Sequence, residues 1–97
     1  MEFDCTEFCK ALADDTRQQI LQMLLDKEMC VNDIAEVFPM SQPTISHHLG
    51  ILRRFDLVTS RKEGKQVFYA INHDNLVECC GKLMARFCVE IPAECED

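Results

Sequence analysis

The sequence lacks the features that define several broad classes of protein. No apolar run approaches the ~20 residues of a membrane-spanning helix, and the first residues carry neither the basic nor the apolar stretch of a secretory signal. There is no internal repeat, no low-complexity tract and no glycine-rich phosphate loop. These absences predict a cytoplasmic protein that has no membrane partner. They also leave little room for an enzyme in a chain of 97 residues.

The length predicts one domain over residues 1–97, with a hydrophobic core that is thin for its surface. A partner subunit that completes this core is therefore expected. Positive charge is also scarce, since 17 acidic residues outnumber 10 basic ones and the net charge is −7.

The few basic residues are unevenly placed. Residues 41–70 contain five of the ten, with only two acidic residues among them, whereas the segments on either side are acidic. A local basic block on an acidic body can face phosphates while the rest of the surface repels them. The alternative is a solvated basic face that has no partner. The block consists of Arg53, Arg54, Arg61, Lys62 and Lys65.

Seven cysteines are the other unusual feature of the composition. In a reducing compartment, cysteines more often indicate metal or redox chemistry than a disulfide framework. Free cysteine also packs as a small apolar residue, so burial alone is the competing explanation. The seven are Cys5, Cys9, Cys30, Cys79, Cys80, Cys88 and Cys95.

Hydrophobic periodicity predicts three short helices in the first forty residues. The first covers about residues 4–13, with one apolar face that includes Cys5 and Cys9. The second begins at a capping Asp15 and ends near Lys27. Its predicted buried stripe consists of Ile20, Leu21, Leu24 and Leu25. The third carries Ile34 and ends at Pro39.

The second half of the chain predicts a polar-faced helix, a hairpin and a long last helix. Ser41 is a good N-cap for the first of these, with Ile45, Leu49 and Leu52 facing inward. Residues 57–63 and 66–71 predict two strands joined by a Gly-Lys turn. The last helix spans about residues 74–90, and an acidic tail follows over 91–97.

This order of elements predicts a mainly α fold with a β-hairpin wing, which is a winged helix-turn-helix. Such folds place one helix in the major groove of DNA and the wing on its backbone. The apolar stripes of the first and last helices exceed the needs of a small core. We therefore expect these two helices to form a homodimer interface.

Three segments resemble the ArsR/SmtB family of metalloregulatory repressors. Residues 41–58, with the run Ser-His-His-Leu and a trailing Leu-Arg, resemble its recognition helix. Residues 10–21 resemble a segment near the start of the family's chain, and residues 64–71 resemble its second wing strand. The likeness covers roughly residues 8–90. The resemblance implies a homodimeric repressor that binds a palindromic operator in double-stranded DNA and leaves it when a ligand binds.

On the matching positions, the resemblance implies contacts to bases and phosphates from the recognition helix and the wing. His48 stands apart, because packing inward is as good an explanation for it as a contact with DNA. The implied DNA-binding residues are Ser41, Gln42, Thr44, Ser46, His47, Arg61, Lys62 and Lys65.

The family's sensing motif on the third helix is broken in this chain. Residues 28–34 read Glu-Met-Cys-Val-Asn-Asp-Ile, so Cys30 matches the first cysteine of that motif while Asn32 replaces the second. The resemblance to arsenic-responsive members instead implies ligands on the last helix, from Cys79, Cys80 and Cys88. The inducer would be As(III) or another thiophilic metal ion, because soft thiolates select such ions.

Geometry limits this thiol site. Two cysteines eight residues apart on a helix are separated by about 12 Å of rise, so Cys80 and Cys88 cannot both bind one ion within one helix. Thiols from another element or the partner subunit would have to complete the site. The remaining candidates are Cys5, Cys9, Cys30 and Cys95.

A second mechanism uses the same kind of atoms. Cys30 at a helix N-terminus could pair with Cys88 in a disulfide or polysulfide, which would make the protein a redox or persulfide sensor. Outside regulation, an enzyme and a winged helix that binds only proteins are the competing classes. Steeply salt-dependent binding to DNA would argue against both of them.

Overall fold

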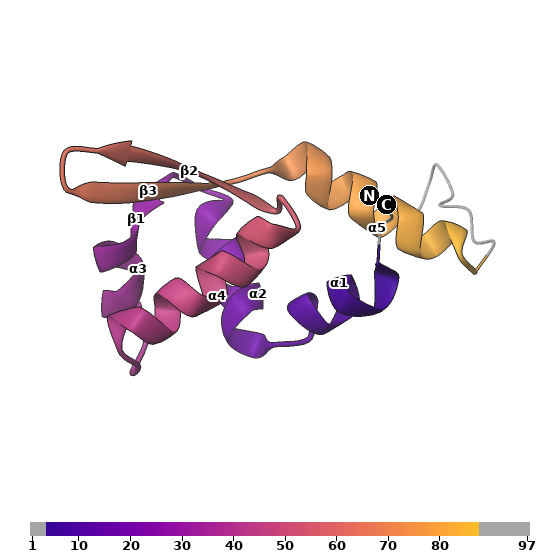
Figure 1. Ribbon diagram of the computed structural model, residues 1–97, viewed down its shortest axis with the longest axis horizontal. Coiled ribbons are helices and arrows are strands. Elements are labelled where there is room, and N and C mark those ends of the chain that lie inside the picture. Colours follow the sequence, from indigo (N-terminus) through magenta and orange to yellow (C-terminus); the bar gives the residue numbers. More distant parts are fainter. Residues whose placement is uncertain (1–3, 88–97) are drawn as a thin grey trace.

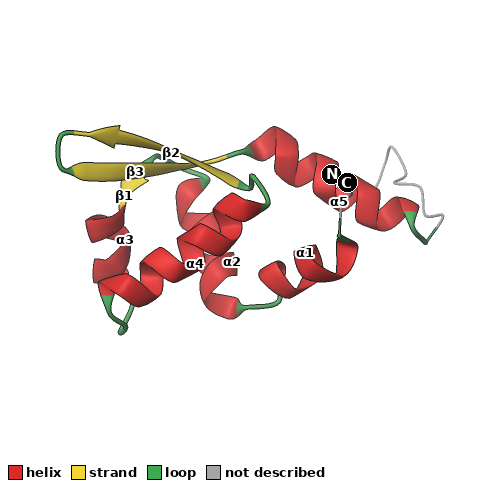
Figure 2. Cartoon of the chain, in the orientation of Figure 1, coloured by secondary structure: helices red, strands yellow, loops and turns green. Residues whose placement is uncertain are grey.

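The computed structural model describes residues 4–87 of the chain. Five helices and three strands follow one another in the order expected for a winged helix-turn-helix (Figures 1 and 2). The prediction of a mainly helical chain with a β-hairpin is confirmed. The elements are α1 (Cys5–Leu12), α2 (Asp15–Leu24), β1 (Met29–Cys30), α3 (Val31–Val37), α4 (Gln42–Arg54), β2 (Val58–Glu63), β3 (Gln66–Ile71) and α5 (His73–Ala85).

Side-chain caps fix the starts of four helices. Asp4, Asp14, Ser41 and Asn72 each accept a hydrogen bond from the backbone N–H three residues on, which satisfies an amide that has no partner inside the helix. The cap of α2 is therefore Asp14, and the prediction of Asp15 was wrong by one residue. The helix also ends at Leu24, earlier than Lys27.

The sheet has three antiparallel strands in the order β1-β3-β2. The β2–β3 hairpin turns at Gly64, whose φ of +62° suits a residue without a side chain. The short strand β1 was not predicted, because two residues are too few to show an alternating pattern. Through it, the segment before α3 pairs with β3, so the wing is attached to the helical part of the molecule.

One hydrophobic core joins the helices to the sheet. Ile45, Leu49 and Leu52 on α4 have no exposed surface, and neither do Phe8 of α1 and Ile34 of α3. Burial of apolar side chains such as these is the dominant favourable contribution to the free energy of folding. Leu25 differs from its prediction: it lies just past the end of α2 and is 52% exposed.

Helices α1 and α5 lie side by side at the end of the molecule away from the hairpin (Figure 1). No helix between residues 4 and 87 is long and apolar enough to cross a membrane. Helix α5 extends to Ala85, and its predicted end near residue 90 lies outside the described residues. Cys88, Cys95 and the predicted acidic tail over 91–97 lie outside the described residues.

Candidate nucleic-acid interface and thiol sites

The exposed face of α4 is polar and its start is tightly capped. The Ser41 hydroxyl accepts a hydrogen bond from the Thr44 N–H at 3.3 Å, and the two hydroxyl oxygens lie 3.0 Å apart. The predicted contact residues of this helix are all exposed, while the opposite face is buried in the core. The helix therefore presents donors and acceptors to solvent on a rigid support. The exposed set is Ser41, Gln42, Thr44, Ser46 and His47.

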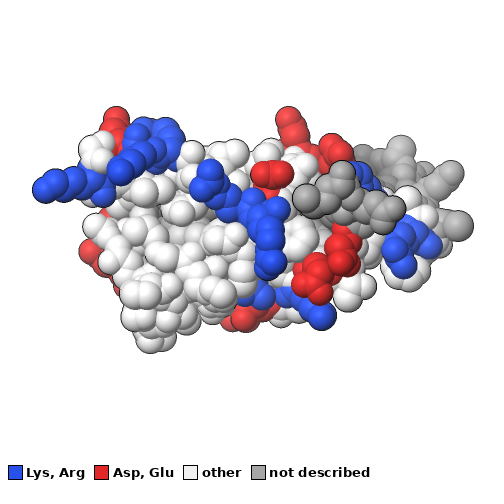
Figure 3. Space-filling view, in the orientation of Figure 1, with Lys and Arg blue, Asp and Glu red and all other residues white. Residues whose placement is uncertain are grey.

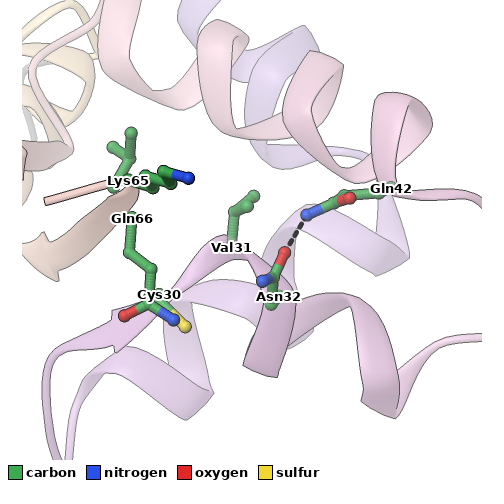
Figure 4. A pocket seen from close by; sticks show the side chains of 7 residues that line it. Cys30, Val31, Asn32, Gln42, Lys65 and Gln66 are labelled. Atoms are coloured by element: carbon green, nitrogen blue, oxygen red, sulfur yellow. Dashed lines mark hydrogen bonds between the residues drawn. The ribbon is translucent and has the colours of Figure 1, made fainter.

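A second contact ties the start of α4 to the start of α3. The Gln42 side-chain amide donates to the carbonyl oxygen of the Asn32 side chain (Figure 4). Beside this bond lies a hollow of about 120 Å³ between α3, α4 and the hairpin turn, lined also by Cys30 and Lys65. The Gln42 side chain is thus tied to α3 through its nitrogen, and within residues 4–87 its own carbonyl oxygen accepts no hydrogen bond, so it can accept one from a base.

His48 points inward, away from the face carried by its neighbour His47. Its Nδ1 lies 3.0 Å from Nη1 of Arg17, and since a guanidinium can only donate, this ring nitrogen accepts and His48 is neutral. Arg17 also donates to the carbonyls of Lys10 and Ala11 at the end of α1. His48 therefore helps to position the recognition helix and is not part of its exposed surface.

Burial, chiefly, and the charges of Arg17 and His47 hold the pKa of His48 below its usual 6.5, although Asp14 at 3.8 Å works against them. The unfolded chain therefore binds a proton here more readily than the folded one. We expect the free energy of unfolding to fall as the pH drops from about 6.5 through the lower folded-state pKa. His48→Gln should make this loss smaller, measured by urea unfolding between about pH 7.5 and pH 5. An unchanged slope would contradict the assignment.

The wing carries three of the predicted contact residues, and they differ in environment. Lys62 and Lys65 are exposed, and neither has a carboxylate partner within residues 4–87. Arg61 instead forms a bidentate ion pair with Glu28, at 2.8 and 2.7 Å, and a second pair with Glu63 at 3.3 Å. Lys62 and Lys65 therefore carry the positive charge of the wing that no carboxylate of the described residues pairs with.

Basic side chains form two groups on one face of the molecule. In Figure 3 they gather at the tip of the hairpin and over the middle of the face, with acidic side chains beside the hairpin tip and toward the end formed by α1 and α5. Arg53 and Arg54 in the last turn of α4 are exposed and add to the basic part. The start of α4, at the lower left of Figure 1, carries no Lys, Arg, Asp or Glu. Two local basic groups on an otherwise acidic chain suit a surface that meets phosphates.

The two adjacent cysteines of α5 are in different surroundings. Cys79 is buried in the core, with 5% of its surface exposed, and burial raises the pKa of its thiol. Cys80 is half-buried and packs against the same core. Among residues 4–87, no three His, Cys, Asp or Glu side chains come together in a group that could hold a metal ion. The described part of one chain thus supplies two of the three predicted thiols.

Asn75 links Cys79 to the end of the recognition helix, a link that the sequence analysis did not find. Its side-chain amide donates to the carbonyl oxygen of Phe55, the C-cap of α4, at 2.6 Å, and lies 3.6 Å from the Cys79 sulfur. The only sequence signal was an Asn one turn before a cysteine on the last helix. Cys30 is also buried, at the N-cap of α3, and makes no side-chain capping bond there.

Comparison with known proteins agrees with this arrangement. The sequence model of the arsR family of bacterial regulatory proteins matches residues 14–60, from the start of α2 into β2. A possible transcriptional regulator for arsenical resistance, known from a crystal structure, superposes with a TM-score of 0.74 at 33% identity, over 84% of this chain and 83% of the other. The chain belongs to the ArsR family of transcriptional regulators. Members of this family bind DNA and are not enzymes.

Two relatives illustrate how much of the ArsR-family sequence is shared. The transcriptional repressor SdpR of Bacillus subtilis is 41% identical over 65% of this chain and 70% of its own length. The arsenical resistance operon repressor of Staphylococcus aureus is 45% identical over 66% of this chain, but over only 62% of its own length. The family model covers α2 to the start of β2 and does not reach α5, so the family assignment does not by itself carry over an effector.

Proposed function

We propose that this ArsR-family regulator is a dimeric repressor that binds a two-fold operator with α4 in the major groove and the wing along the backbone. The single observation that carries the proposal is the exposed polar face of α4, capped at Ser41 and supported by the buried Leu49 and its neighbours. Hydroxyl, amide and imidazole groups on that face suit base edges and phosphates. The wing lysines Lys62 and Lys65 supply the backbone contacts.

Exposed apolar side chains on α5 and just after it support the dimer, whereas Phe8 of α1 is buried in the core of its own chain. Val77 is 66% exposed and Phe87 70% exposed. Leu76, Leu83 and Met84 of α5 are only partly buried. A second copy that packs on these helices would cover the apolar surface and place the two recognition helices about a symmetry axis. Half-sites one helical turn apart, roughly 34–36 Å, would then match the protein.

We further propose that a thiophilic effector, with As(III) preferred, binds through Cys79 and Cys80 and releases the operator. Cys88, outside the described residues, or a thiol of the partner subunit would complete the three sulfur ligands. The name of the staphylococcal relative, an arsenical resistance operon repressor, supports this choice of ion. Asn75 gives a route to DNA, because moving the Cys79 sulfur would disturb an amide that also holds the end of α4.

The alternative effector chemistry uses Cys30, paired with Cys88 in a disulfide or polysulfide. One observation favours keeping it: Cys30 lies between β1 and α3 and borders the same hollow as Gln42 and Lys65. A disulfide or polysulfide formed at the Cys30 sulfur would alter the hollow that Gln42 and Lys65, two of the proposed DNA contacts, also line.

Salt dependence of DNA binding tests the interface. Lys62→Gln and Lys65→Gln should each reduce the slope of log affinity against log salt by about 1, because each removes one phosphate contact. Gln42→Ala should instead weaken binding to the preferred sequence by a factor of about 5 to 150 while leaving the slope unchanged. Fluorescence anisotropy of a labelled duplex over a sodium chloride series measures both.

Lys27→Gln is the matched control, since Lys27 is an exposed lysine that lies on neither α4 nor the wing. It should leave the slope as in the wild type. If the wing variants behave like this control, the wing does not contact the DNA backbone.

A further inference from the structure

Arg61 lies on one face of the sheet together with the residues that surround it. In the strand register Arg61 is opposite Phe68, and Phe68 is opposite Cys30 on its other side. Side chains of directly opposed residues lie on the same face of a sheet, so these three share one face. The other face carries Met29 and Tyr69, which pack against the core. Cys30 is covered, with 3% of its surface exposed, but along the hairpin this face is open, and the Arg61 side chain on it is 50% exposed. Arg61 is therefore on the face that points away from the core.

On that outer face the Arg61 side chain reaches across the central strand. Its guanidinium carbon lies 4.8 Å from the centre of the Phe68 ring, in cation–π geometry. Its nitrogens then bind both oxygens of Glu28, the residue just before β1. Because the strand order is β1-β3-β2, this one side chain reaches from one edge strand, β2, to the residue that leads into the other, β1.

We propose that Arg61 is a wing-positioning residue, with Glu28 as its anchor, and that it holds the β2–β3 hairpin at the angle at which Lys62 and Lys65 meet the DNA backbone. Alternation along β2 puts Lys62 on the opposite face from Arg61. The bidentate contact fixes direction as well as distance, which a lysine could not do. The inference rests on the proposed DNA-binding function and replaces a direct phosphate contact for Arg61.

Substitution of Glu28 distinguishes a positioning role of Arg61 from a direct contact between Arg61 and phosphate. Glu28 and Glu63 both hold the same guanidinium and raise its pKa further above the usual range for arginine. Glu28→Gln removes a negative charge, so Coulomb's law alone predicts DNA binding that is unchanged or tighter. A positioning role predicts weaker DNA binding instead, because the guanidinium loses its anchor beside β1.

Anisotropy titrations of a duplex that the wild type binds test this prediction. We expect Glu28→Gln and Arg61→Gln each to weaken binding about 2- to 5-fold, since a partly exposed ion pair holds its partners with moderate strength. Both should lower the salt slope to the same small extent, because a wing that is no longer held loses part of its lysine contacts with phosphate. Glu63→Gln is the matched control: it removes a carboxylate from the same guanidinium, but Glu63 lies on β2 itself and cannot tie it to β1. It should bind as the wild type does or slightly more tightly.

Amide hydrogen exchange of the protein without DNA gives an independent readout. Exchange in β2 and β3 should be faster in Glu28→Gln and Arg61→Gln than in Glu63→Gln, with α2 and α4 unchanged. Tighter binding by Glu28→Gln, or a salt slope lowered by about 1 in Arg61→Gln alone, would overturn the inference and restore Arg61 as a phosphate contact. If the wild type bound no duplex, the proposed function would fail, while the exchange experiment would still test the positioning role.

Discussion

Leu49→Ala is expected to cost about 2–5 kcal/mol of the free energy of unfolding. Leu49 has no exposed surface and lies in the core cluster that joins α4 to the other helices and to the start of β2. Small domains are stable by only about 5–15 kcal/mol, so the loss would be a large part of the total. Because this core supports the exposed face of the recognition helix, DNA binding should weaken as well. Urea unfolding at a fixed protein concentration measures the change.

Gly50→Ala is the control in the neighbouring position. A Cβ added at Gly50 would meet nothing within 4 Å, and the residue lies inside a helix where glycine is unfavourable. This variant should therefore be more stable than the wild type by up to about 1 kcal/mol. If Leu49→Ala unfolded at the same urea concentration as the wild type, α4 would not be anchored as described.

Removing the thiols of α5 should abolish most of the response to arsenite. With Cys79→Ala or Cys80→Ser, we expect the arsenite concentration for half-release of DNA to rise at least about tenfold, because loss even of an outer partner of a metal ligand costs about that much. Alanine is chosen at position 79 since that side chain is buried and a serine hydroxyl there would need a partner. DNA binding without arsenite should be close to that of the wild type in Cys80→Ser, whereas Cys79→Ala also removes the sulfur beside Asn75 and should weaken it.

Cys9→Ser and Cys30→Ser serve as controls for this experiment. Cys9 is exposed on α1, and Cys30 is buried far along the chain from α5. Cys30→Ser should release DNA at nearly the wild-type arsenite concentration if Cys79 and Cys80 are ligands, and so should Cys9→Ser unless Cys9 of the partner subunit supplies the third sulfur. A full response in the α5 variants would rule out that site. Loss of release by polysulfide in Cys30→Ser alone would favour the Cys30–Cys88 mechanism instead.

Much of the fold can be predicted from local sequence patterns. Ser41 caps α4 as predicted, the inward positions of that helix are buried, and Gly64 lies in the turn of the hairpin. Such features depend on residues within a few positions of one another, so the sequence reveals them. The errors are also local: adjacent Asp14 and Asp15 are equally good caps by type, and only the backbone decides between them.

The contacts that the sequence did not reveal join residues far apart in the chain. Arg61 and Glu28 are separated by 33 positions, and His48 and Arg17 by 31. Charge counting placed Arg61 among the free cations, because no sequence pattern shows which carboxylate will neutralise it. Likewise, adjacent helix positions point about 100° apart, but only the packing shows that Cys79 rather than Cys80 enters the core.

The most direct test of the central proposal is selection of duplexes from a random DNA library by the wild-type protein, followed by sequencing of the bound fraction. A dimer that places two copies of α4 in successive major grooves should enrich an inverted repeat whose half-sites are about 10 bp apart, centre to centre. Changing Gln42 to Ala should relax the preference at one position of each half-site. Enrichment of no sequence, or of a single unrepeated site, would contradict the proposal.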